Sequence, residues 1–251
     1  MQKLTALIPA GNEIHNIKAV IESVNFADEI LVVDSYSTDG TYEKALELAT
    51  KVLRREYQYS ASQKNWAIPQ AEHEWILLVD SDERVTPELK SEILEILNNP
   101  PSDLVAFWVG RNNHFMGERV HYSGWRNDKV IRLFKRDFCK YEDKHVHAEI
   151  ITNGNVGVLE NKLYHNTYIT FDKHLEKMNR YAWWQAKDYD NKTGKLTPYH
   201  FIVKPFWGFF KHYIIQSGFR DGVVGLTIGY LQGYVIFMRY VKLWLLRRNR
   251  K

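Results

Sequence analysis

Two carboxylates, Asp80 and Asp82, directly follow an apolar run over residues 75–79. A short, unbroken run rich in Ile, Leu and Val is typical of a strand buried on both faces of a parallel sheet. The two acids then lie at or just beyond the carboxyl end of that strand, where open α/β sheets bind ligands. Oxygen ligands this close together suit a hard cation such as Mg²⁺ or Mn²⁺, with a substrate phosphate completing its shell. The alternative interpretation is a polar turn that ends the strand and starts the next helix.

A third carboxylate, Asp34, ends a second apolar run over residues 29–33. Helix-like segments separate this run from its neighbours, and strands that alternate with helices indicate a parallel sheet with right-handed crossovers. Successive parallel strands run in the same direction, so we expect Asp34 and Asp80 at the same edge of the sheet. This convergence favours a shared site over two unrelated turns.

The elements that position these acids follow from apolar periodicity and helix-start signals. Thr86-Pro87-Glu88 is a strong helix start, because it combines a capping hydroxyl, a proline at the first position and an acid in the first turn. Pro9 is expected to stop the first strand. The predicted strands are 4–8, 29–33, 51–55 and 75–79, and the predicted helices are about 12–24, 42–49, 60–68 and 87–97.

From residue 103 onward the pattern changes to short, often alternating runs punctuated by glycines, which predicts strands and hairpins. These runs are 104–109, 119–122, 129–135, 145–151 and 156–163. The last third is helical in pattern, over about 171–189, 201–216 and 222–246. We therefore expect an α/β domain over residues 1–168 and a helical C-terminal extension over residues 169–251.

The composition, 45% hydrophobic and 25% charged, is that of an ordinary globular protein. A net charge of +4 is too small to indicate a nucleic-acid partner, and we expect none. The single cysteine, Cys139, excludes an intrachain disulfide and a Cys-rich zinc site, and it fits a reducing compartment. Met1 leads directly into a strand-like run, so we expect no signal peptide and a cytoplasmic location.

Four motifs in register over residues 4–166 resemble family-2 glycosyltransferases of the GT-A fold, which is Rossmann-like, with a mainly parallel sheet and helices on both faces. They are Ile8-Pro9-Ala10-Gly11-Asn12-Glu13, Val32-Val33-Asp34-Ser35-Tyr36-Ser37-Thr38-Asp39-Gly40-Thr41, Gln63-Lys64-Asn65 and Asp80-Ser81-Asp82. Later pieces are similar to the branch that builds lipopolysaccharide core, and most of all to its β-glucosyltransferases. These pieces are Arg132-Leu133-Phe134, His147 through Glu149 and Tyr164-His165.

The resemblance implies a hexosyltransferase-like, inverting enzyme of bacterial surface-glycan synthesis. Its donor is a nucleotide-diphosphate sugar, UDP-sugars above all, and its acceptor is a saccharide or a lipid-linked glycan. A divalent cation, Mg²⁺ or Mn²⁺, bridges the donor diphosphate and acts as a Lewis acid on the leaving group. By the family's pattern Asp82 binds the metal and Asp80 lies near the ribose beside it. His165 is a candidate third ligand, or alternatively a structural histidine.

The resemblance also assigns the nucleotide pocket. Asp34 accepts hydrogen bonds from the base or ribose, because a carboxylate accepts well from an imide N–H or a hydroxyl. Pro9, Asn12 and Glu13 line the pocket. Lys64 faces the base or the phosphates, and the planar fork of Arg132 suits phosphate or acceptor oxygens. These side chains have plainer alternatives: Lys64 and Arg132 as solvated surface charges, and Glu13 as a first-turn helix acid.

Inverting transfer needs a base that takes the proton of the acceptor hydroxyl. We assign this role to Glu149. His147 and Glu149 are two residues apart, so both point to one face if residues 145–151 form a strand. Relatives place the acid directly after the histidine, whereas Ala148 stands there in this chain. Either Glu149 or His147 is therefore the expected base, and a buried structural role for His147 is the alternative.

The C-terminal segment has an uncharged stretch over residues 222–238, whereas a spanning helix needs about 20 apolar residues. We expect helices that pack on the catalytic domain or lie in a bilayer interface, at the inner face of the cytoplasmic membrane. Aromatics such as Phe206 and Trp207 suit that placement, and so do terminal cations that an anionic leaflet attracts. These cations are Arg247, Arg248, Arg250 and Lys251. The alternative is a soluble extension with buried aromatics.

Two other functions are compatible with the same arrangement of strands and acids. A sugar nucleotidyltransferase normally carries a Gly-rich phosphate loop with a basic residue after the first strand, and residues 9–13 lack that basic residue. A non-catalytic glycan-binding protein needs no acidic constellation, and the intact set of Asp34, Asp80 and Asp82 argues against it. The sequence therefore favours a glycosyltransferase.

Overall fold

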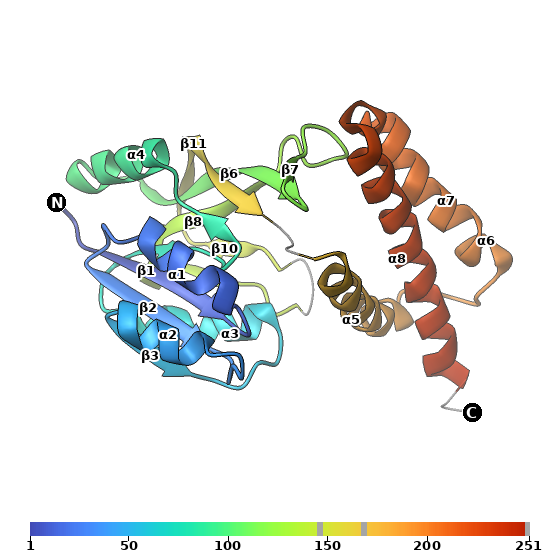
Figure 1. Cartoon of the computed structure of the whole chain (residues 1–251), viewed down its shortest axis with the longest axis horizontal. Helices are drawn as coiled ribbons and strands as arrows, with labels where there is room; N and C mark the ends of the chain where they lie inside the picture. The colour runs from blue at the N-terminus through green and yellow to red at the C-terminus, as the bar shows by residue number, and fades with distance from the viewer. Residues whose placement is uncertain (145–147, 167–169, 249–251) are drawn as a thin grey trace. The chain divides into compact units, whose positions relative to one another are not determined.

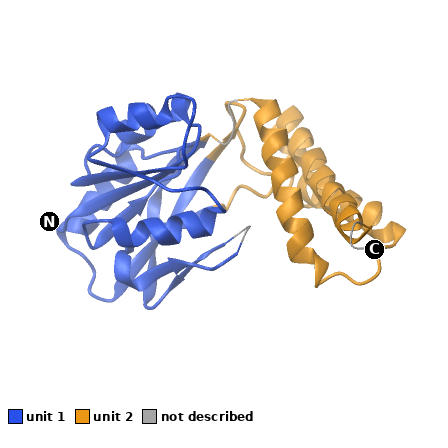
Figure 2. Ribbon diagram, turned by 90° about the horizontal axis from the view of Figure 1, so that it is seen from below, with its two compact units in different colours: residues 1–112, 129–165 blue, residues 113–128, 166–251 orange. Residues whose placement is uncertain are grey.

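The computed structural model describes residues 1–144, 148–166 and 170–248. It divides into two compact units, one of residues 1–112 with 129–165 and the other of residues 113–128 with 166–251 (Figure 2). The segment 113–128, which the sequence-based division placed in the first domain, clusters with the second unit. The boundary expected between residues 168 and 169 lies outside the described residues and stays a prediction.

A mixed sheet organises the first unit, with the strand order β3-β2-β1-β4-β8-β6-β11-β5 (Figure 1). Its first half is parallel: β1 pairs with both β2 and β4, and β2 pairs with β3. Strand β8 then runs antiparallel to both β4 and β6. The bounds are β1 Leu4–Ala10, β2 Glu29–Asp34, β3 Lys51–Arg54, β4 Trp75–Leu78, β5 Glu83–Arg84, β6 Leu104–Phe115, β8 Lys129–Lys135 and β11 Asn155–Asn166.

Smaller strands complete the described part of the chain. β9 (Cys139–Tyr141) pairs with β10 (Ile150–Thr152) as a separate antiparallel pair. β7 (Glu118–Arg119) pairs with the end of β6 inside the second unit. The predicted strand 145–151 is therefore wrong in its extent, because the described strand begins only at Ile150.

Helices cover both faces of the sheet, as predicted, and this confirms the α/β class. Ala6 and Ile8 of β1 pack in one core with Ile17 of the first helix, whereas Leu7 packs in the opposite core with Ala61. Side chains alternate along a strand, so an apolar run such as β1 supplies both cores. The helices are α1 (Ile14–Ser23), α2 (Thr41–Leu48) and α4 (Pro87–Asn98) beside the first core, and α3 (Ser60–Ala67) beside the second.

Strand β1 continues through Pro9 to Ala10, two residues beyond the stop expected from the proline. The pairing with β4 ends at Leu7, so no partner on that side needs the N–H that proline lacks. The Pro9 carbonyl on the same side accepts a hydrogen bond from Ser81 Oγ at 2.9 Å. The proline therefore marks the end of the β1–β4 pairing and not the end of the strand.

Helices α5 (Phe171–Asp190), α7 (Val203–Phe210) and α8 (Gly222–Arg248) form the body of the second unit, with a short α6 (Pro198–Phe201). Three glycines of α8 at four-residue spacing, Gly225, Gly229 and Gly233, lie against the preceding segment. A Cβ on Gly225 would lie 1.8 Å from the Gly218 carbonyl oxygen, and one on Gly233 would lie 2.9 Å from the Pro205 oxygen. The missing side chains therefore allow the two backbones to approach closely.

Three cations of α8 are bound to α5. Lys242 Nζ lies 2.7 Å from the Asn179 carbonyl, and Arg239 Nε donates to Gln185 Oε1 at 2.9 Å. Arg247 Nε lies 2.8 Å from Asp190 Oδ1. Arg247, expected as a membrane-facing charge, is thus part of a helix–helix contact. Arg250 and Lys251 lie outside the described residues.

Candidate functional site

The carboxyl edge of the parallel strands brings the predicted acids to one side of the sheet. Asp34 ends β2 and lies opposite Ala10, the last residue of β1. Asp80 follows β4 by two residues, and the Val79 N–H before it donates to the Leu7 carbonyl of β1 at 3.0 Å. β1 lies between β2 and β4, so its end separates the two acids at this edge.

Two loops at this edge are bound to each other. The Asn12 N–H donates to Ser37 Oγ at 2.9 Å, and Asn12 Oδ1 accepts from the Thr38 N–H at 2.9 Å. The Glu13 N–H donates to Thr41 Oγ1 at 2.8 Å. Asn12 has a φ of 56°, a left-handed conformation that asparagine adopts more readily than most residues. Helix α1 therefore starts two residues later than predicted, and the second loop supplies the polar partners of its first turn.

Asp34 and Gln63 present buried oxygen atoms without partners among the described residues. The Asp34 carboxylate is fully buried; its Oδ2 accepts from the Ser37 N–H at 3.1 Å, while Oδ1 has no partner. Gln63 Nε2 donates to Ser35 Oγ at 3.2 Å, while Oε1 has no partner. A buried acceptor left unpaired costs stability, so these two oxygens are suited to N–H or O–H donors of a ligand.

Gln63 is absent from the predicted site residues, although it stands in the quoted motif beside Lys64. The sequence feature that could have indicated Gln63 as a site residue is its position one residue before Lys64. Its burial was not visible in the sequence, because α3 has a mixed polar pattern in which Gln63 and Lys64 are both buried.

Asp80 is bound by two buried cations. Lys64 Nζ lies 2.8 Å from Asp80 Oδ1, and Arg132 forms an ion pair with Oδ2. Lys64 and Arg132 are 7% and 3% exposed, so the surface-charge alternative is wrong for both. Burial alone would raise the pKa of Asp80, but the charges of Arg132 and Lys64 outweigh it and hold the pKa far below its ordinary value. The carboxylate therefore stays ionised between two fixed cations.

Glu83 is a further buried acid that the site prediction missed. Its carboxylate has no exposed surface, accepts from the Asp80 N–H at 3.1 Å and lies 2.8 Å from Arg132. Arg111 lies 3.4 Å from the same oxygen of Glu83. Glu83 thus shares Arg132 with Asp80 and fixes the direction of its guanidinium.

Asp82 and His165 lie beside each other. The antiparallel pairing of β11 with β5 sets His165 opposite Glu83, and His165 Nε2 lies 3.5 Å from Asp82 Oδ2. Among the described residues, no three His, Cys, Asp or Glu side chains gather into a group that could hold a metal. A carboxylate and an imidazole still fit Mn²⁺ or Mg²⁺, because such ions take one or two protein ligands and complete their shells with phosphate and water.

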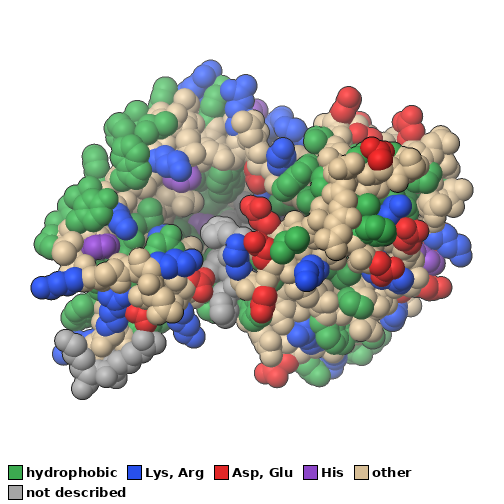
Figure 3. Space-filling model, turned by 180° about the vertical axis from the view of Figure 1, so that it is seen from behind, with side chains coloured by type: hydrophobic (Ala, Val, Ile, Leu, Met, Phe, Trp, Pro, Cys, Tyr) green, Lys and Arg blue, Asp and Glu red, His purple; other side chains and the backbone are tan. Residues whose placement is uncertain are grey.

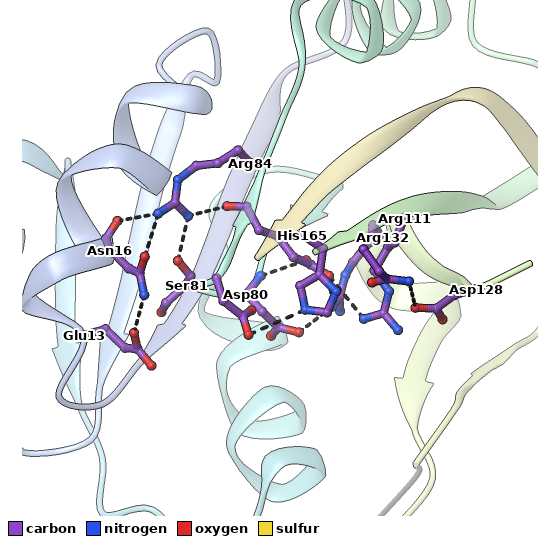
Figure 4. A network of polar contacts seen from close by, with 12 residues as sticks. Glu13, Asn16, Asp80, Ser81, Arg84, Arg111, Asp128, Arg132 and His165 are labelled. Carbon is purple, nitrogen blue, oxygen red and sulfur yellow. Dashed lines mark hydrogen bonds and ion pairs between the residues drawn. The ribbon is translucent and has the colours of Figure 1, made fainter. Parts of the chain in front are cut away.

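Glu13 belongs to a second set of contacts, which runs through Arg84 (Figure 4). Glu13 Oε2 accepts from Asn16 Nδ2 at 2.8 Å, and Asn16 Oδ1 accepts from Arg84 at 3.0 Å. The same guanidinium donates to the Ser81 carbonyl at 2.7 Å. Burial lowers the pKa of Arg84, although the nearby charges of Asp82 and Glu13 oppose this effect. Arg84 therefore ties the β1–α1 loop to the segment that carries Asp82.

Of the two candidate bases, His147 belongs to the segment 145–147, which the structure does not describe, and Glu149 follows that segment closely. His147 and its neighbour His145 are not among the described residues. Glu149 is exposed and precedes β10. It is therefore not in a strand, and the predicted strand face shared with His147 is wrong for Glu149. The Glu149 carbonyl accepts a hydrogen bond from the Glu142 N–H at 2.9 Å.

The chain was compared with known proteins. The family model "Glycosyl transferase family 2" matches residues 5–152. An uncharacterized glycosyltransferase of Rickettsia felis is 28% identical over 97% of this chain and 90% of its own length. The lipopolysaccharide core biosynthesis glycosyltransferase LpsC of Rhizobium meliloti is 28% identical over 94% of this chain and 93% of its own length.

Among solved structures, the mannosyltransferase PcManGT from Pyrobaculum calidifontis, in complex with GDP-Man and Mn²⁺, is similar with a TM-score of 0.55. The match covers 97% of this chain and 87% of that protein at 15% identity. An identity this low supports the shared fold alone.

Proposed function

This chain belongs to glycosyl transferase family 2 and is a glycosyltransferase, and we propose that it moves a sugar with inversion from a nucleotide-diphosphate donor to a saccharide or lipid-linked acceptor. The single observation that carries this proposal is the carboxyl edge of the parallel strands. There a buried acid with an unpaired oxygen, Asp34, ends β2, and the segment after β4 carries Asp80 with two fixed cations. Such an edge suits a ligand with N–H donors at one end and a diphosphate at the other.

The nucleoside end of the donor is assigned to Asp34 and Gln63. Their unpaired buried oxygens accept hydrogen bonds from the base or ribose. The backbone around Pro9 and Asn12 closes this pocket, since the Asn12 loop is bound to the loop that follows Asp34. A uracil imide N–H is a donor of the required kind, so a UDP-sugar is the favoured donor.

Lys64 and Arg132 are assigned to the donor phosphates. Both are permanently charged: burial alone would lower the pKa of each, but ion pairing with Asp80 raises both above their ordinary values. Asp80 and Glu83 hold these cations in place, so the enzyme spends little free energy to order them when the donor arrives. Electrostatic stabilisation of this kind favours the departure of the nucleoside diphosphate.

A divalent cation is assigned to Asp82 and His165. Held there, it would supply Lewis-acid stabilisation to the leaving nucleoside diphosphate. The protein's contribution is to hold the two ligands side by side, which the β11–β5 pairing does. Arg84 adds a fixed positive charge near Asp82 and Glu13.

The acceptor proton is assigned to Glu149, with His147 as the alternative. Glu149 is exposed and lies on the loop before β10, where an entering acceptor can reach it. The acceptor itself we assign to bacterial surface glycan of the lipopolysaccharide type. The full-length similarity to LpsC supports this class, and it favours a cytoplasmic enzyme that works at the inner face of the cytoplasmic membrane.

Release of nucleoside diphosphate from a panel of nucleotide sugars, with Mn²⁺, Mg²⁺ or a chelator, tests the proposal. We expect metal-dependent release from one class of donor, with UDP-sugars first, and its loss in Asp82→Asn. Binding of all donors without turnover, with and without acceptor glycans, would point to the non-catalytic alternative. Formation of a nucleotide sugar from nucleoside triphosphate and sugar phosphate would point to a nucleotidyltransferase.

A further inference from the structure

Large apolar side chains stand exposed on one face of helices α7 and α8. Figure 3 shows hydrophobic side chains gathered over the helices of the second unit. The residues that define this α7–α8 face are Ile202, Phe206, Trp207, Val223, Tyr230 and Trp244, which are 45% to 81% exposed. Soluble proteins rarely expose contiguous apolar surface on this scale without a partner.

The spacing shows that the exposed apolar residues of α8 form one stripe along the helix. On α8, Val223, Tyr230, Phe237 and Trp244 recur every seven residues and are all exposed. The other sides of α8 are occupied: the Gly225–Gly233 side packs against the segment of α7, and Lys242 contacts α5. On α7 the exposed pair Phe206 and Trp207 follows Ile202 by one turn. Each helix thus leaves one apolar side without cover in the described part of the chain.

From these features we infer that the α7–α8 face binds the surface of an anionic lipid bilayer and lies in its headgroup region. The charge of the segment identifies lipid as the occupant. Residues 191–251 contain eleven Lys and Arg residues and one acid, Asp221, whereas the whole chain carries only +4. Asp221 is itself bound to the backbone N–H groups of His121 and Tyr122. An anionic leaflet attracts such a surface, while a second copy of it repels.

The cations that remain exposed beside the apolar face are Lys211, Arg220 and Arg248. We assign these three cations to the lipid phosphates. Arg247 is not among them, because it contacts Asp190 of α5. Tyrosine and tryptophan side chains, abundant on the face, favour the headgroup region because they combine an apolar ring with a polar group. The face therefore has the composition of an interfacial helix pair.

The packing against α5 explains why α8 lies on a bilayer and does not cross it. The stretch Gly218–Arg248 is long and apolar enough to span a membrane by length and composition. Helix α5, however, carries eight charged residues and is tied to α8 through Lys242, Arg239 and Arg247. A spanning α8 would pull those charges into hydrocarbon at high cost. Only the side of α8 away from α5 is free for lipid.

Vesicle flotation of the full chain tests the inference, with phosphatidylcholine vesicles compared with vesicles that also contain phosphatidylglycerol. We expect binding to the anionic vesicles that salt weakens. The double variant Phe206→Ser/Trp207→Ser should lower the partition coefficient by about tenfold or more, since each aromatic ring loses its apolar burial. The matched control Leu46→Ser/Val158→Ser, which removes equally exposed apolar side chains of the first unit, should bind as the wild type does.

Two results would overturn the inference. One is equal flotation of the wild type and the α7–α8 variant. The other is a stable dimer in sedimentation velocity that this variant dissociates, with no vesicle binding, because the face is then a protein interface. That this surface brings the enzyme to a lipid-linked acceptor rests on the proposed function. Nucleotide binding measured in the same proteins separates the two: a variant that loses vesicle binding but keeps nucleotide binding supports the membrane face, whereas a wild type that binds nucleotide but not vesicles counts against the membrane face alone.

Discussion

At the scale of single residues, the candidate site contains two carboxylates in different surroundings. Asp80 is neutralised by Lys64 and Arg132, whereas Asp82 lies beside an imidazole and is 22% exposed at its side chain. We assign the divalent cation to the second arrangement. We therefore propose separate tasks for the two acids of this short motif.

We predict that Asp82→Asn abolishes metal-dependent nucleotide binding and leaves the melting temperature nearly unchanged. The amide keeps the shape of the side chain but loses the charge that attracts a divalent cation. Calorimetric titration of the nucleoside diphosphate with and without Mn²⁺ measures the effect. Undiminished Mn²⁺-dependent binding in the variant would show that the metal is held elsewhere.

Glu149→Gln should lower turnover by about two to four orders of magnitude, the usual scale for a positioned acid–base group, with donor affinity nearly kept. Steady-state rates with saturating donor provide the measurement, and calorimetry of the donor is the control. If this variant stays active while His147→Ala is dead, the base is His147. If both variants stay active, Asp128 is the next acid to test.

Glu83→Gln should destabilise the protein by about 3 kcal/mol or more, because it leaves Arg132 and Arg111 with one buried anion fewer. Urea unfolding measures the loss. Glu88→Gln, an exposed acid in the first turn of α4, is the matched control. Equal midpoints for the two variants would mean that the buried charge contributes little to stability.

At the scale of elements, short strands and close helix contacts decide which residues meet. Strand β5 contains only Glu83 and Arg84, too short for any periodic signal, yet its pairing with β11 brings His165 to Asp82. In the second unit the glycines of α8 have the corresponding role. The position of Gly225 is the most constrained of these, since a Cβ there would lie 1.8 Å from the Gly218 carbonyl oxygen.

We predict that Gly225→Ala destabilises the second unit by at least about 1–3 kcal/mol, the usual cost of overpacking, because its Cβ meets the Gly218 backbone. Thermal unfolding followed by circular dichroism measures the change. Gly194→Ala serves as the control, since no atom lies within 4 Å of its added Cβ. If both variants unfold at the same temperature, the Gly218 and Gly225 backbones can move apart without loss of stability.

At the scale of the whole molecule, acid stability provides a test of α5 packing. Burial, with a contribution from Lys177, lowers the pKa of His174 from 6.5 to about 4. The ring of His174 lies edge-on to that of Phe115, with the ring centroids 5.3 Å apart. The unfolded chain binds the proton more tightly than the folded one. Above about pH 6.5, His174 therefore does not lower the free energy of unfolding. As the pH falls from 6.5 toward 4, its protonation in the unfolded chain lowers that free energy.

Accordingly, the stability of the wild type relative to His174→Gln should decrease as the pH is lowered from 6.5 to 4, because glutamine does not titrate. Urea midpoints of both proteins across this range measure the difference. A difference that stays constant with pH would show that His174 titrates alike in the folded and unfolded chains.

The sequence by itself determined most of the parallel strands, the helices between them and the edge at which those strands end. Apolar runs bounded by acids predicted β2 and β4, and Thr86-Pro87 predicted the start of α4, where Thr86 Oγ1 accepts from the Leu89 N–H. These features depend on neighbours along the chain, so local pattern is sufficient. The parallel order of the first strands then placed Asp34 and Asp80 at one edge.

Only the tertiary structure decided which side chains meet at that edge. Lys64 and Arg132 reach Asp80 from α3 and β8, and their burial depends on packing that no local pattern encodes. Similarly, Arg247 resembled a free tail cation until the packing of α8 on α5 placed it beside Asp190. Contacts between distant segments depend on strand register and on the packing of several elements together. The sequence therefore predicted most of the candidate residues, while the fold added Gln63 and Glu83 and determined the partners of all of them.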